Sequence, residues 1–162
     1  MSPVTQDNQL RSMVRDGVVR AIGAIGLAGI ALIHTIDAPG HFVGGPDTWL
    51  GLMYVGLIAS SLILAAGLIA SGDRRLWVAA AGLTATVMIG FVLSRTVGLP
   101  GDSGDVGNWG EALGIASLFV EGALLTLSLG WLSAERLELA ARSVTRWFDR
   151  RRASAGEVAA AG

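Results

Sequence analysis

The sequence contains no cysteine and no lysine, and it has only two histidines. Without cysteine, the chain can form no disulfide, no thiolate metal site, no covalently attached c-type haem and no thiol redox centre. Every basic residue other than histidine is an arginine, and together with abundant Ala and Gly this indicates a GC-rich coding bias. Net charge is also nearly absent at −1, so only the distribution of the charges is informative.

Long polar stretches are scarce, because 52% of the 162 residues are hydrophobic and the mean hydropathy is +0.57. Four apolar stretches each have about the twenty residues that a helix needs to cross a hydrocarbon core of roughly 30 Å. They cover residues 18–36, 49–70, 76–97 and 112–132. We therefore predict an all-α, integral membrane four-helix bundle, with the lipid bilayer as its surroundings.

The arginines predict the orientation of these spans. All of them except Arg95 fall on one side, in the N-terminal segment, in the turn near residue 74 and after the fourth span. Cytoplasmic loops collect arginine, so we expect a multi-pass cell-membrane protein with both termini inside the cell. The same rule and anionic lipid headgroups account for this basic surface, so no nucleic-acid partner is expected. The loops over 37–48 and 98–111 then face outward.

Four regions are predicted along the chain. A polar cytoplasmic segment over 1–16 precedes the transmembrane bundle over 17–133. Residues 134–152 combine helically spaced apolar positions with arginines, which predicts a cytoplasmic amphipathic helix. Such a helix could lie in the headgroup layer or dock on a partner. Residues 153–162 are expected to form a disordered tail.

Glu121 lies near the middle of the fourth span. An ionised carboxylate at that depth costs at least about 2.5 kcal/mol, so it must be paired, protonated or near water. A structural pair and a functional acid both remain open. Arg95, at the outer end of the third span, could snorkel outward, reach Glu121, or bind acids of the second outer loop. With those acids it forms a predicted extracytoplasmic polar cluster: Arg95, Asp102, Asp105 and Glu111.

Both histidines fall in one short stretch, His34-x2-Asp37-x3-His41. Helical spacing puts His34 and Asp37 on one face, and a following turn could bring His41 back over His34. Imidazole and carboxylate together suit a transition metal, such as zinc, copper, nickel or iron. His34, Asp37, His41 and Glu121 are therefore candidate metal ligands, and a hydrogen-bonded structural cluster is the alternative. Axial haem ligation is disfavoured, because the histidines are too close together on one helix end.

Three pieces of the sequence resemble a known group of proteins. These are the segment over 33–42 with His34 and His41, the S-R-T-x-G-L-P segment over 94–100, and Glu121 in the fourth span. They are similar to small four-helix membrane proteins of high-GC Gram-positive bacteria. The resemblance covers most of residues 31–132, and the segment after the third span is its most specific part. It implies a fold and a topology, with no reaction attached.

No catalytic constellation accompanies these features, since neither Ser94 nor Ser103 has an evident base and acid, and no phosphate-binding glycine loop occurs. The leading hypothesis is a non-catalytic accessory or assembly subunit that associates with other membrane subunits or with itself. Its extracytoplasmic cluster would bind a metal, a small ligand or a partner. One alternative is a membrane redox or metal-handling protein that uses His34, Asp37, His41 and Glu121. Another is a small oligomeric proton-coupled carrier that uses Glu121.

Overall fold

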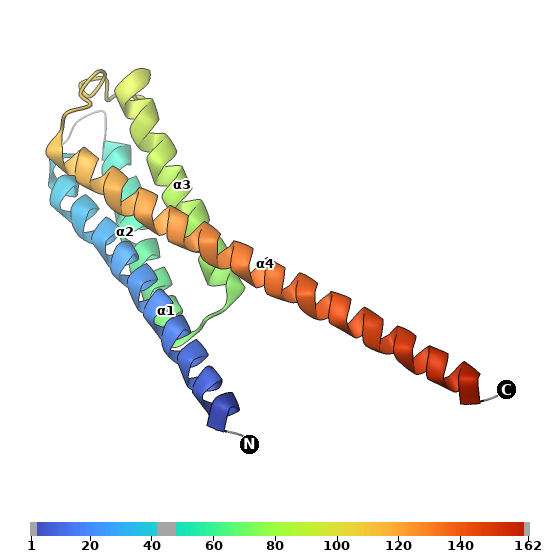
Figure 1. Cartoon of the computed structure of the whole chain (residues 1–162). Coiled ribbons are helices and arrows are strands. Elements are labelled where there is room, and N and C mark those ends of the chain that lie inside the picture. Colours follow the sequence, from blue (N-terminus) through green and yellow to red (C-terminus); the bar gives the residue numbers. More distant parts are fainter. Residues whose placement is uncertain (1–2, 42–47, 161–162) are drawn as a thin grey trace. The chain divides into compact units, whose positions relative to one another are not determined.

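The computed structural model describes residues 3–41 and 48–160, without the side chains of residues 3–5, 40–41, 48, 142, 148–149 and 151–160. Within these ranges the chain is helical and has no strand (Figure 1). Its elements are α1 (Pro3–Asp37), the 3₁₀ helix η1 (Ala38–His41), α2 (Thr48–Ala70), α3 (Arg74–Thr96) and α4 (Ala112–Ala160). Each α-helix is long and apolar enough to cross a membrane. The predicted all-α fold with four spans is confirmed.

The first helix begins earlier than the polar composition of residues 1–16 predicts. It starts at Pro3, which suits a first helical position because its missing N–H would have no helical partner there. An ion pair between Asp7 and Arg11, one turn apart, supports this segment at 3.1 Å. The apolar span and the polar N-terminal segment are therefore one helix.

The middle turn makes α2 and α3 antiparallel neighbours. The Asp73 carboxylate caps α3 by accepting a hydrogen bond from the Arg75 backbone N–H at 2.8 Å. One turn later Trp77 is fully buried, close to Leu68 of α2 and to the bare backbone of Gly23 in α1. A Cβ atom at Gly23 would lie only 2.8 Å from the Trp77 ring, so this glycine makes room for the indole. Trp77 thus fills the bundle at the end with the α2–α3 turn.

The fourth helix is continuous from Ala112 to Ala160 and belongs to two compact units. Its first part packs in the unit of residues 1–129, where Val120 and Leu124 lie over Gly29 and Gly26 of α1. The second unit, residues 130–162, is described as the rest of this helix up to Ala160. The amphipathic segment over 134–152 is therefore not a separate helix. Residues 153–160 are helical where we expected a disordered tail, since four of these eight residues are alanine, the best helix former.

The polarity of the bundle is reversed relative to a water-soluble protein. Phe119 is 78% exposed, whereas Glu121, two residues further along α4, has no exposed surface at all. Large apolar side chains on every α-helix point outward. Among the side chains that the structure describes, the buried polar or charged ones are His34, Ser61, Thr84, Ser94, Arg95, Ser117, Glu121 and Ser128. Such an arrangement is stable when hydrocarbon surrounds the helices and polar side chains satisfy each other inside. The fold is that of a small multi-pass membrane protein.

Candidate functional site

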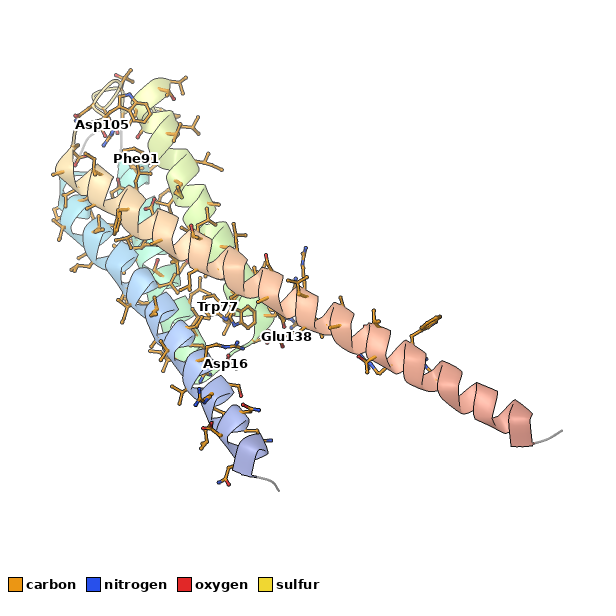
Figure 2. The ribbon with its side chains drawn as sticks, in the orientation of Figure 1. Asp16, Trp77, Phe91, Asp105 and Glu138 are labelled. Carbon is orange, nitrogen blue, oxygen red and sulfur yellow. The ribbon has the colours of Figure 1, made fainter. Side chains whose placement is uncertain are left out.

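A cavity of about 710 Å³ lies inside the unit of residues 1–129. Its wall includes His34 of α1, Tyr54 of α2, Phe91 of α3, Glu121 of α4 and Asp105 of the α3–α4 loop. Phe91 and Asp105 lie toward the end of the bundle where α1 ends and α2 begins, and Trp77 lies toward the opposite end (Figure 2). The cavity therefore belongs to the end that carries the α3–α4 loop, which we call the loop end.

Arg95 attaches this loop to the bundle. Its side chain is only 5% exposed, and its two terminal nitrogens form ion pairs with Asp105 and Glu111. The guanidinium lies over the Phe91 ring, with Cζ 4.9 Å from the ring centroid, a cation–π arrangement. The Arg95 carbonyl also accepts a hydrogen bond from the Gly107 backbone N–H at 2.9 Å. Of the roles considered for Arg95, these contacts correspond to binding of the loop acids.

The rest of the loop is built from tight turns. Leu99 and Asp102 exchange two backbone hydrogen bonds of 2.8 and 2.9 Å, flanked by Gly98 with a φ of +79°. That left-handed conformation favours glycine, which explains the glycine of the S-R-T-x-G-L-P segment. The Trp49 indole N–H donates to the Pro100 carbonyl at 2.8 Å and ties the loop to the start of α2. Asp102 lines the cavity, whereas the described ion pairs of Arg95 are with Asp105 and Glu111.

Tyr54 of α2 contacts both Asp37 and His34, the acidic and the basic residue that were predicted to share a face at the end of α1. Its hydroxyl donates to the Asp37 carboxylate at 2.9 Å, and its ring meets the His34 ring edge to face at 5.1 Å. His34 Nδ1 lies 2.9 Å from the Ile30 carbonyl, which fixes Nδ1 as the protonated nitrogen and leaves Nε2 as an acceptor if the ring is neutral. Tyr54 was not among the site residues predicted from the sequence. Two features of the sequence could have pointed to Tyr54: it is the one tyrosine in the chain, and it lies near the outer end of a predicted span.

Glu121 forms part of the cavity wall although its side chain has no exposed surface. Its Oε1 accepts a hydrogen bond from the Ser117 hydroxyl at 2.5 Å, and its Oε2 has no hydrogen-bond partner in the described part of the chain. His34 of α1 lines the same cavity. Arg95, considered as a partner for Glu121, has its terminal nitrogens on the loop acids instead. Ser117 was also missed, although its position four residues before Glu121 places both on one helix face.

The candidate metal ligands are not assembled into a metal centre among the described residues. There, no group of three or more His, Cys, Asp or Glu side chains is placed to hold an ion. His34, Asp37 and Glu121 are instead each engaged by a hydrogen bond within the bundle. The side chain of His41, the fourth predicted ligand, lies outside the described part.

Comparison with protein families, with curated proteins and with solved structures gives no match for this chain. The geometry of the cavity is therefore the basis on which a function can be argued.

Proposed function

We propose that this chain is a non-catalytic multi-pass membrane protein that binds a small molecule in the cavity at its loop end. The observation that carries the proposal is the cavity itself, about 710 Å³ in volume. Sites for small molecules are typically concavities of about 300–1,000 Å³ with mostly apolar walls and a few convergent polar groups. Here the polar groups converge from four helices and a loop, and the apolar wall includes Leu50, Leu57, Leu83 and Val87.

The half of the bundle away from the loop end favours a protein that binds its ligand over one that transports it across the membrane. Leu27, Leu68, Trp77 and Leu124 are buried there with at most 2% of each side chain exposed. Close-packed interiors of this kind leave no continuous route for a solute. A ligand that enters at the loop end therefore meets a layer of buried, mostly apolar side chains, which favours a binding protein over the proton-coupled carrier.

The loop end is preorganised for a ligand. Arg95 and Trp49 hold the α3–α4 loop in place through ion pairs and a hydrogen bond that need no bound molecule. Holding a loop in its working position before binding reduces the entropy lost on association. This fixed loop suits capture of a ligand, and it accounts for an arginine buried far from the others.

The distribution of arginine supports the cellular orientation. The turn with Arg74 and Arg75 lies at the end opposite the cavity, as does the N-terminal part of α1 with Arg11 and Arg15. By the positive-inside rule that end is cytoplasmic, so the cavity receives its ligand from outside the cell membrane. The apolar exterior of the helices suits lipid and a second membrane subunit alike, which is compatible with an accessory role.

Glycines of α3 offer a direct test of the cavity. Gly90 contributes to its wall and Gly82 does not, and at both positions an added Cβ atom would meet nothing within 4 Å. Gly90→Leu should therefore fill part of the cavity, whereas Gly82→Leu is the matched control on the same helix. The detergent-purified protein is dialysed to equilibrium against each of three aromatic probes: tetraphenylphosphonium, uncharged triphenylphosphine oxide and tetraphenylborate. Empty micelles provide the background.

We expect saturable binding of at least one probe, with about one molecule per chain, weakened about tenfold or more by Gly90→Leu and unchanged by Gly82→Leu. A cavity-filling side chain competes directly for the volume of the probe. Absence of saturable binding for all three probes, or equal binding by the Gly90→Leu protein, would contradict the proposal.

A further inference from the structure

We infer that the ligand of this cavity is an organic cation with an apolar body, and that the carboxylate of Glu121 is its charge partner. The inference rests on the proposed function and adds the chemical class of the ligand. Among the described residues, the wall carries the carboxyl groups of Asp37, Asp102, Asp105, Glu111 and Glu121, against one guanidinium, that of Arg95, and the imidazole of His34.

The single guanidinium does not compensate this excess of acid. Arg95 is already shared between Asp105 and Glu111, so that group of three carries more negative than positive charge. Arg95 Nε is buried without a hydrogen-bond partner and could meet an anion. An anion placed there would also face the two carboxylates, and like charges in a partly dehydrated site repel strongly. The wall therefore selects against anions.

Glu121 provides the specific anchor. Its Oε2 is fully buried and has no hydrogen-bond partner in the described part of the chain, while Oε1 is held by Ser117. At 1.5 Å per residue it lies about 14 Å from the start of α4, near the middle of a hydrocarbon core of about 30 Å. An ionised acid at this depth is costly unless a partner compensates its charge, so such an acid usually has a partner or a functional role. A cation in the cavity would supply the missing partner.

The remainder of the wall defines the body of the ligand. Apart from the acids, it consists mainly of aliphatic and aromatic residues, among them Tyr54 of α2 and Phe91 of α3. Rings attract cations through their faces and accept apolar groups by burial. A compact inorganic ion would leave this apolar volume unfilled. A protonated or quaternary amine, or a phosphonium with apolar substituents, fits both parts of the cavity.

The test uses the same three probes, which share aryl groups and differ in charge. The wild-type protein should bind tetraphenylphosphonium at least about tenfold more tightly than triphenylphosphine oxide, and it should not bind tetraphenylborate saturably. This comparison needs no variant. Equal affinity for the cation and the uncharged probe, or tighter binding of the anion, would overturn the inference and leave the proposed function standing.

The role of Glu121 is tested by Glu121→Gln. This variant should lose about tenfold or more in affinity for the phosphonium and keep its affinity for the uncharged probe within about twofold. Glu121→Asp keeps the charge and should retain the preference for the cation. Asp16→Asn removes an equal charge from the opposite end of the bundle and should change neither affinity (Figure 2). If Glu121→Gln keeps the full preference for the cation, Glu121 is not the charge partner.

Discussion

At the scale of single residues, the most consequential interaction is the one between Arg95 and the α3–α4 loop. A buried charge is tolerated when it is paired, and removing one member of the pair leaves the other charges uncompensated. Arg95 is almost fully buried, while the side chains of Asp105 and Glu111 are 38% and 34% exposed. The loss should therefore be smaller than for a fully buried pair, since water can solvate the two acids in part.

Arg95→Gln should lower the free energy of unfolding by about 2 kcal/mol, because it removes both ion pairs and the contact with the Phe91 ring. The measurement is unfolding in mixed micelles with increasing sodium dodecyl sulfate, followed by circular dichroism. Arg11→Gln is the matched control, since Arg11 and Asp7 are 78% and 61% exposed and such pairs contribute less than about 1 kcal/mol. Equal effects of the two variants would show that Arg95 does not hold the loop.

The same residues show where sequence reasoning ends. The acids that could bind Arg95 were identified from the loop composition, but spacing alone did not decide between them, the membrane surface and Glu121. That choice depends on the turn at Gly98, which directs the chain back toward Arg95. The hydrogen bond between Tyr54 and Asp37 joins two helices, and no local pattern in one segment predicts which residue of another will face it.

At the scale of the elements, hydrophobic stretches of about twenty residues predict the four spans well, because crossing a bilayer imposes a minimum length. The ends of α1 and α4 were predicted less well. Both helices continue from apolar sequence into polar sequence, and the change in composition marks the edge of the apolar stretch, not the end of the hydrogen-bonded helix. Composition therefore gives the membrane boundary and leaves the helix boundary open.

The contact between α3 and α4 at the cavity depends on one glycine. A Cβ atom at Gly114 would lie 2.5 Å from Phe91 Cε2 and 3.2 Å from Glu111 Oε2. Gly114→Ala should therefore push the Phe91 ring away from Arg95 and destabilise the protein by about 1–3 kcal/mol, the usual cost of overpacking. Gly122→Ala, on the same helix with nothing within 4 Å of the added atom, should be neutral or stabilising. The same unfolding titration measures both, and a harmless Gly114→Ala would show that the two helices pack less closely there.

At the scale of the whole chain, two separate features suit a protein that spans a bilayer. Apolar side chains cover the outside of the bundle while polar ones lie inside, and arginines gather at one end. The exposed apolar side chains suit a surrounding of lipid, while polar side chains such as Glu121 and Ser117 meet inside the bundle. By the positive-inside rule, the arginines predict that one end of the bundle faces the cytoplasm. The cavity and its excess of acid lie at the opposite end. Orientation therefore decides which compartment supplies the ligand, and it can be measured independently of any ligand.

Single cysteines can report this orientation without a background, because the chain has none of its own. Ser103 is exposed in the α3–α4 loop, and Ser71 is exposed in the turn between α2 and α3 at the other end. In intact cells, a membrane-impermeant maleimide should label Ser103→Cys at once and label Ser71→Cys only after the membrane is permeabilised. The expected difference follows from the arginines near Ser71, which by the positive-inside rule predict a cytoplasmic location for that turn. The reverse pattern would place the cavity inside the cell, and the binding proposal would then require a cytoplasmic ligand.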